Sequence, residues 1–232
     1  MNYSLPIYFV AFVLIVSAKY SKNNAKEMSS RTDSNLYCST FPNDLAIIST
    51  KTLTINVKVS WDCRISNQGI INNGNCATIN YRQQVDTLYL HCLPLYLPQI
   101  FCLKNLQLLN ISGCHEQWEI PLDIVSITNL KNLSLVQIQL HDMSKIVQLR
   151  SPLTYLDLSK NQITTILSEI TTFSKTLTHL ILSENRLQNV PIELVSMEKL
   201  EYLNIKNNWF TDDEKARIRN LFVINKKIQL IL

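Results

Sequence analysis

Glycine is scarce in this chain, with three residues among 232, at Gly69, Gly74 and Gly113. Phosphate-binding loops need several glycines within one turn, so the sequence excludes a Walker loop and a dinucleotide-binding fingerprint. Charge is also low: 17% of residues are charged, and 22 Lys and Arg against 18 Asp and Glu give a formal net charge of +4. Because these charges form no block of five or six of one sign, we expect no nucleic-acid partner.

Long hydrophobic runs are scarce too, and the clearest one lies at the start of the chain. The run Leu5–Ala18 is shorter than the roughly 20 apolar residues that span a bilayer, and it ends in small residues. We therefore predict a signal peptide over residues 1–18, a secreted, extracellular mature chain and no membrane span. An uncleaved signal anchor is the alternative, because residues 1–4 contain no Lys or Arg. Residues 19–35 are polar and aperiodic, which predicts a flexible leader.

A repeat begins at Val85 and occupies most of the remaining chain. Each unit has apolar residues at positions one, four, six and often eleven. The units start at Val85, Leu106, Leu130, Leu153, Leu177 and Leu200. The units at Leu153 and Leu177 match the pattern L-x-x-L-x-L-x-x-N-x-L in full. Such constant spacing indicates a stack of similar coils, one per unit.

These units resemble the leucine-rich repeat family over residues 85–210. The resemblance implies an α/β leucine-rich repeat solenoid, with a curved parallel sheet on its concave side and short helices and turns on its convex side. Packing agrees, because leucines at positions four and six point inward and one coil cannot bury them alone. An apolar residue precedes proline at Pro98, Pro121 and Pro191, where we expect the coils to turn back on the convex side.

Asparagine at position nine has a predicted structural role. Asn161, Asn185 and Asn208 can satisfy backbone groups in the turn after each strand, as a buried turn requires. Leu93 and Ile138 hold this position in the first and third units. We therefore expect the first and third coils to be less regular than the others.

The N-terminal end of the solenoid needs a cap, because an open end exposes its core and a strand edge. We predict a β-rich, cysteine-containing N-cap over residues 36–84. Apolar and polar residues alternate over Leu53–Trp61, which predicts a half-buried strand. Residues 67–75 are rich in Asn and Gly and predict a turn, after which Ala77–Tyr81 can form another strand.

The C-terminal end, residues 211–232, is predicted to form a capping helix followed by a strand. Thr211 and Glu214 have the spacing of a capping box, which marks a helix start. The last six residues, 227–232, are apolar enough for one more strand. This closing segment resembles that of some microbial leucine-rich repeat proteins.

Six cysteines lie in the N-terminal half, at Cys38, Cys63, Cys76, Cys92, Cys102 and Cys114. In an exported chain an even, clustered count indicates disulfides, and we predict the pair Cys63–Cys76 around the Asn/Gly-rich loop. Cys102 and Cys114 have a second interpretation, as small buried hydrophobic residues. A zinc site formed by His91-Cys92 and Cys114-His115 is a weaker alternative, since the usual Cys-x-x-Cys spacing is absent. The favoured prediction has no metal and no cofactor.

Catalytic motifs are missing around the histidines at His91, His115, His141 and His179. His179 and Asp157 fall on adjacent coils, where the concave face can bring them together. A His–Asp pair without an oriented nucleophile is more often a surface contact, so we predict that the protein is not an enzyme.

The concave face carries the predicted binding site. Positions three, five and seven of each unit point outward there, and they are amphipathic with few charges. Such surfaces favour protein contacts, so we predict a protein ligand on this face. The predicted contact residues are Tyr89, Tyr155, Asp157, His179, Tyr202 and Lys206. The alternative is a matrix or cell-surface structural component that binds glycans or copies of itself.

Two glycosylation acceptor sequences, Asn110-Ile-Ser and Asn132-Leu-Ser, fall on the same face. Glycans on Asn110 and Asn132 would cover the N-terminal half of the sheet and shift the binding footprint to the last three coils. If both sites are skipped, the whole face stays open.

The signal peptide predicts cleavage after Ala18, because small residues end the apolar run there. Mature protein isolated from its source should begin at Lys19, as read by N-terminal mass spectrometry. Protein that still begins at Met1 and fractionates with membranes would contradict the prediction.

Overall fold

The computed structural model describes residues 65–66, 69–70, 76–79, 84–91, 100, 102–114, 120, 122–223 and 227–232. The predicted signal peptide, the leader and the strand over Leu53–Trp61 lie outside the described residues. Within residues 67–75, predicted as one turn, the structure has the second strand of a short hairpin instead. In this hairpin β1 (Ile65–Ser66) pairs with β2 (Gly69–Ile70) in antiparallel orientation.

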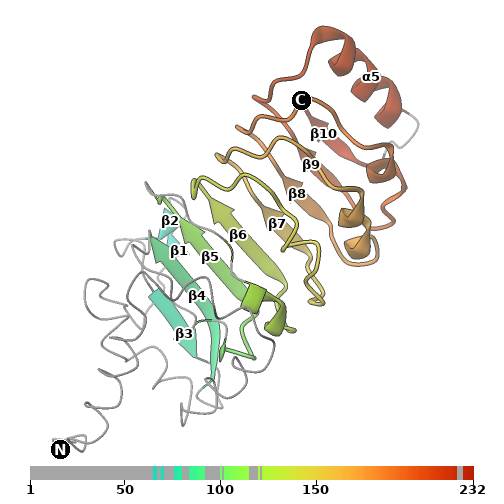
Figure 1. Cartoon of the computed structure of the whole chain (residues 1–232). Coiled ribbons are helices and arrows are strands. Elements are labelled where there is room, and N and C mark those ends of the chain that lie inside the picture. The colour runs from blue at the N-terminus through green and yellow to red at the C-terminus, as the bar shows by residue number, and fades with distance from the viewer. Residues whose placement is uncertain are drawn as a thin grey trace, which may run out of the picture.

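The main sheet has eight strands, ordered β10-β9-β8-β7-β6-β5-β4-β3 (Figure 1). Its N-terminal edge strand, β3 (Cys76–Ile79), lies antiparallel to β4. The repeat strands are β4 (Val85–His91), β5 (Leu108–Ser112), β6 (Asn132–Val136), β7 (Tyr155–Asp157), β8 (His179–Ile181) and β9 (Tyr202–Asn204). With β10 (Gln229–Ile231) they form seven parallel strands in an open sheet. The predicted solenoid is confirmed, with one strand for each of the six units.

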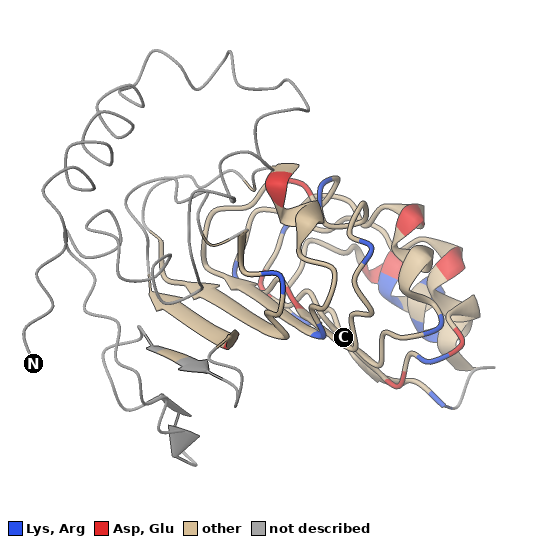
Figure 2. Ribbon diagram, turned by 90° about the horizontal axis from the view of Figure 1, so that it is seen from below, with Lys and Arg blue, Asp and Glu red and all other residues tan. Residues whose placement is uncertain are grey.

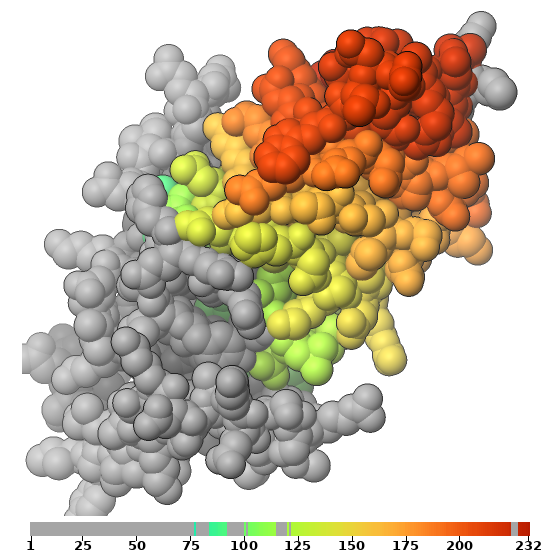
Figure 3. Space-filling view, turned by 45° about the horizontal axis from the view of Figure 1, so that its top comes forward, coloured from blue at the N-terminus to red at the C-terminus, as the bar shows by residue number. Residues whose placement is uncertain are grey.

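Short 3-10 helices return the chain on the side opposite the sheet. They are η2 (Leu122–Ser126), η3 (Ser168–Phe173) and η4 (Ile192–Ser196). The helices η2 and η4 start directly after Pro121 and Pro191, as the apolar-proline pattern predicts. The coil of Leu153 forms η3 without proline, so proline is not required for this turn. Figure 3 shows the successive coils as bands that lie side by side toward the C-terminus.

The core consists of the inward-pointing residues of the coils. At positions four and six every unit contributes two side chains with no solvent exposure: Leu88 and Leu90, Leu109 and Ile111, Leu133 and Leu135, Leu156 and Leu158, Leu180 and Leu182, Leu203 and Ile205. Each such side chain contributes about 2 kcal/mol through burial of apolar surface. Since every coil covers the next, these residues form one continuous core.

Buried asparagines connect successive coils after the strands. The Asn185 amide nitrogen donates to Leu158 O of the preceding coil at 2.9 Å and to Leu182 O of its own coil at 3.1 Å. Its side-chain oxygen accepts from Ile163 N of the preceding coil at 3.0 Å. Asn161 and Asn208 repeat this arrangement one coil before and one coil after. The predicted role of position nine is confirmed.

The residue just before this asparagine position is left-handed in five consecutive coils. Position eight holds Gly113, Gln137, Lys160, Glu184 and Asn207, with φ between 56° and 73°. In the first four of these coils its N–H donates to the position-seven carbonyl of the next coil, as Lys160 N does to Ser183 O at 3.0 Å. A left-handed conformation costs about 1 kcal/mol for a residue other than glycine, so this repeated bond offsets a repeated strain.

The third coil shows the predicted irregularity. With Ile138 at position nine, both of its neighbours are left-handed: Gln137 has φ 56° and Gln139 has φ 58°. The Asn161 side-chain oxygen accepts from two N–H groups of this coil, Ile138 N at 3.1 Å and Leu140 N at 3.0 Å. The bond from Leu140 N is the one that Asn185 and Asn208 also accept from their preceding coils, whereas the bond from Ile138 N is an addition of this irregular turn.

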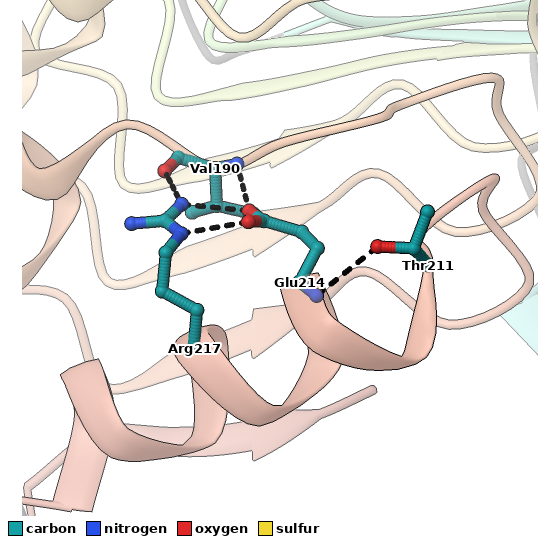
Figure 4. A network of polar contacts seen from close by, with 4 residues as sticks. All are labelled: Val190, Thr211, Glu214 and Arg217. Carbon is teal, nitrogen blue, oxygen red and sulfur yellow. Dashed lines mark hydrogen bonds and ion pairs between the residues drawn. The ribbon is translucent and has the colours of Figure 1, made fainter.

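The helix α5 (Asp212–Val223) and the strand β10 close the C-terminal end (Figure 1). Thr211 Oγ1 accepts from Glu214 N at 3.2 Å, which is the first half of the predicted capping box. The second half of the capping box, a bond from Thr211 N to the Glu214 carboxylate, is wrong. The carboxylate points to the fifth coil and accepts from Val190 N at 3.1 Å. Arg217 binds that carboxylate at 2.6 Å and donates to Val190 O at 2.6 Å (Figure 4).

This Glu214–Arg217 pair holds both backbone polar groups of Val190. The hydrogen bond from Arg217 is the main reason that the pKa of Glu214 is lowered, and the bond from Val190 N adds to the effect. Glu214, which the sequence predicts to cap the helix, therefore connects α5 to the fifth coil.

Cys102 and Cys114 differ in oxidation state. Cys102 is part of a disulfide, so the interpretation of Cys102 as only a buried hydrophobic residue is wrong. Cys114 is buried as a thiol, in agreement with that interpretation. Of the predicted pair, Cys63 lies outside the described residues and Cys76 begins β3. In the described part of the chain, no helix has the length and apolar character that crossing a membrane requires.

Replacing Asn185 with Ala should lower the free energy of unfolding by about 3 kcal/mol, because buried carbonyls of two coils and one N–H lose their partner. Urea denaturation with an unchanged m-value measures this loss. The exposed neighbour Gln188 provides the control, since Gln188→Ala should change stability by less than about 0.5 kcal/mol. Equal effects of the two changes would contradict the role of Asn185.

The Glu214–Arg217 pair predicts a pH-dependent contribution to stability. Because the pKa of Glu214 is lowered in the folded state, its contribution is complete above the unfolded pKa and lost as pH falls through the folded one. Glu214→Gln should cost about 1 to 2 kcal/mol at pH 7 and progressively less below about pH 4. Urea denaturation at both pH values measures the gap, with the exposed Asp213→Asn as a charge-matched control. A gap that is constant with pH would disprove the ionic contribution.

Candidate binding face

The concave face of the sheet displays residues from positions three, five and seven. On β7, β8 and β9 the middle residue is buried and the flanking two are half-buried. The strand register aligns Tyr155, His179 and Tyr202 in one row across the three strands. Figure 2 shows Lys, Arg, Asp and Glu mainly on loops and on α5, while the strands are largely tan. The sheet surface is therefore aromatic and polar rather than charged.

The aromatic row, defined as Tyr155, His179 and Tyr202, is a line of three neighbouring rings in which His179 stacks on Tyr202 and Tyr155 is tilted against His179. The ring centroids of Tyr155 and His179 are 6.1 Å apart, and those of His179 and Tyr202 are 5.5 Å apart. Interplanar angles of 30° and 27° place the rings close to parallel. His179 Nδ1 lies 2.9 Å from Thr178 Oγ1, and that hydroxyl donates to Thr154 O. The rings are thus positioned by one another and by the backbone beside them.

Asp157 lies at the end of β7, next to this row. Its Oδ1 accepts from Ser159 N at 2.9 Å, and its Oδ2 accepts from Tyr155 OH over 3.5 Å. Burial, followed by the negative charge of Asp157, raises the pKa of Tyr155 to about 12. Tyr155 therefore remains a neutral hydrogen-bond donor across the physiological pH range.

The possible His179–Asp157 pair does not form. Asp157 is aligned with Ile181 in the register, while His179 is aligned with Tyr155. The polar atoms of Asp157 bond to Ser159 and Tyr155, whereas His179 bonds to Thr178. A proton shuttle between these two residues has no structural basis here.

A hollow of about 450 Å³ lies on the same face over β4 to β7. We call it the concave hollow; it is lined by Tyr89, Leu108, Leu109, Asn110, Ser112, Asn132, Ser134, Val136, Tyr155 and Asp157. Tyr89 stands on β4 and Asp157 on β7, with Asn110 and Ser134 between them in the same register row. Burial raises the pKa of Tyr89, which likewise stays neutral.

Both asparagines of the glycosylation sequences line this hollow. They lie on adjacent strands, where Asn110 is aligned with Ser134 and Asn132 with Leu108. Asn132 Oδ1 already accepts from Thr154 Oγ1 at 3.3 Å. A glycan on either residue would fill the hollow, so glycosylation and ligand binding there are mutually exclusive.

The remaining predicted contact residue, Lys206, is exposed at position seven of the last coil. Near it lies Trp209. The strand pattern does not predict Trp209 as a contact residue, because this residue lies in the turn after β9. Its side chain is 59% exposed, and Arg186 of the preceding coil lies 5.4 Å from its ring centroid. Arg186 and Trp209 both occupy position ten, in adjacent units. This shared position is the sequence signal that identifies the contact.

The zinc alternative is incomplete in the described residues, among which no group of three metal-binding side chains occurs. Cys92 and His115 lie outside them. His91 packs against Gly113, where an added Cβ would collide with its ring Cε1 and lie 2.8 Å from Nδ1. Glycine at 113 thus serves close packing as well as its φ of +73°.

The leucine rich repeat family matches residues 151–210 of the sequence. No curated protein matches the chain significantly. Among solved structures, a leucine-rich repeat protein of Leptospira interrogans has 27% identity and a TM-score of 0.50, over 62% of this chain and 37% of that one. Internalin C2 of Listeria monocytogenes has 20% identity and a TM-score of 0.51, over 68% of both chains.

A plant ice-binding protein shares the fold as well, with 21% identity and a TM-score of 0.51 over 62% of this chain and 49% of that one. This chain therefore spans well under two thirds of the Leptospira and plant proteins. At identities of 20% and 21% the Listeria and plant structures show the fold alone.

Proposed function

Since this chain is built of leucine-rich repeats, we propose that it is a secreted, non-catalytic binding protein that recognises a protein partner through its concave face. A leucine-rich repeat fold suggests a protein-binding role. The proposed contact residues are the aromatic row with Tyr89, Asp157 and Lys206. They come from four strands, β4, β7, β8 and β9, and from the turn that follows β9.

The aromatic row is the observation that carries this proposal. Its three rings are half-buried on parallel strands, with ring centroids 5.5 and 6.1 Å apart, and His179 stacks on Tyr202. Tyrosine provides a large amphipathic contact area with few rotatable bonds, so little side-chain entropy is lost on binding. Rings that are already ordered in the unbound protein reduce that cost further.

Two observations support the non-catalytic and secreted parts of the proposal. His179 and Asp157 direct their polar atoms to Thr178, Ser159 and Tyr155 rather than to one another. Cys102 is part of a disulfide, which an oxidising extracellular compartment favours. The apolar start of the sequence agrees with export.

A structural component that binds glycans or itself is the second candidate. The amides and hydroxyls of Asn110, Asn132 and Ser134 in the concave hollow favour it, since sugars are recognised by such groups beside aromatic rings. The protein-binding proposal is preferred because the aromatic row continues from β7 onto two further strands, β8 and β9, beyond the concave hollow.

The double change Tyr155→Ala plus Tyr202→Ala should weaken partner binding at least 30-fold, because central aromatic contacts each contribute about 2 kcal/mol or more. The partner is first isolated on the wild-type mature chain from its native source, and both proteins are then titrated by calorimetry. The matched control is Leu122→Ala plus Ile192→Ala, two residues that are 53% and 64% exposed on the convex side.

Equal affinity of the aromatic variant and the wild type would disprove binding through the aromatic row. Loss of binding in the convex control alone would show that the interface lies on the convex side. Self-association that increases with concentration in sedimentation, and is lost in the aromatic variant, would instead favour the structural component.

A further inference from the structure

We infer that the concave hollow binds an arginine side chain of the protein partner, with Asp157 as its counter-charge. The inference rests on the proposed function and specifies the chemistry that the partner must present. Tyr155 belongs both to the aromatic row and to the lining of the hollow, so the test of this inference changes Asp157 and leaves all three rings in place.

Charge is the first argument. Of the ten residues that line the hollow, Asp157 is the one acidic residue, and none is basic. The ion pairs between described residues are Lys215–Asp212 and Arg217–Glu214, both at the C-terminal helix. Within the described ranges, Asp157 therefore has no cation within 4.0 Å, and its partners are one N–H and one phenol.

Desolvation is the second argument. Asp157 is half-buried at the end of β7, which partly removes its carboxylate from water. A partly desolvated carboxylate without a cation is complementary to an incoming positive charge, which replaces lost hydration. Its Oδ2 has only a 3.5 Å contact with Tyr155 OH and so has capacity for a stronger bond.

The walls of the hollow distinguish arginine from lysine. A guanidinium is planar, stacks on tyrosine rings and has five N–H donors, whereas an ammonium is a compact charge with three. Tyr155 offers a ring beside Asp157, while Asn110, Asn132 and Ser134 offer acceptor oxygens on the floor. Tyr89 and Asp157 are three strand spacings apart, about 14 Å, which accommodates an arginine with its adjoining backbone.

The test uses three blocked tripeptides, Gly-Arg-Gly, Gly-Lys-Gly and Gly-citrulline-Gly, titrated into the mature chain and followed by NMR. Citrulline has nearly the shape of arginine without its charge. Mass spectrometry first establishes that Asn110 and Asn132 carry no glycan, because a glycan would fill the hollow. The arginine peptide should bind at least 10-fold more tightly than the citrulline peptide, with lysine between them.

The variant Asp157→Asn should reduce this arginine preference to less than about 2-fold, because it keeps the shape and removes the charge. Asp213→Asn, an exposed acidic residue on α5, should leave the preference unchanged. The comparison of arginine with citrulline on the wild type needs no variant, so a folding defect of Asp157→Asn cannot mask the answer.

Equal binding of the arginine and citrulline peptides, or no binding of the arginine peptide up to about 20 mM, would overturn the inference. An arginine preference that persists in Asp157→Asn would also overturn it. If the protein partner still requires Tyr155 and Tyr202 in that case, the proposed function stands and this inference alone fails.

Discussion

Each turn after a strand depends on a neighbouring coil for its hydrogen bonds. The asparagine at position nine reaches back to carbonyl and N–H groups of the preceding coil, while the N–H at position eight bonds forward. Because unpaired buried backbone groups cost several kcal/mol together, a turn of this kind is stable only inside the stack. The straight strand rows, and therefore the alignment of the three rings on the concave face, follow from this mutual dependence.

The parts of the fold that follow from period and polarity were predictable from sequence. Leucine spacing predicted the six strands and their buried faces, and asparagine spacing predicted side chains that satisfy backbone groups in the turns, although not that these bonds reach the preceding coil. The left-handed conformation at position eight was not predictable, since Lys160 and Glu184 have no local preference for it and the neighbouring coils impose it. The Glu214 carboxylate likewise followed a tertiary partner, Val190, rather than its local capping pattern.

On the binding face, too, some features follow from the sequence and others depend on contacts between strands. Strand alternation correctly identifies which residues lie on the concave side, but the position of His179 between two tyrosines depends on the register of three strands. The concave hollow was missed because its depth depends on side-chain sizes on four strands at once. Trp209 was missed because its surroundings come from Arg186, one coil away, in a turn that has no strand period.

The bonds between coils also determine how the face can change in size. Every asparagine turn uses the same atoms of its two neighbours, so an extra coil placed between β7 and β8 would find every donor and acceptor already in position. An insertion of one or two residues would instead displace Asn185 from its carbonyls and interrupt the stack. Such a chain can lengthen or shorten its contact surface by whole coils, and each added coil would extend the row of rings by one strand spacing.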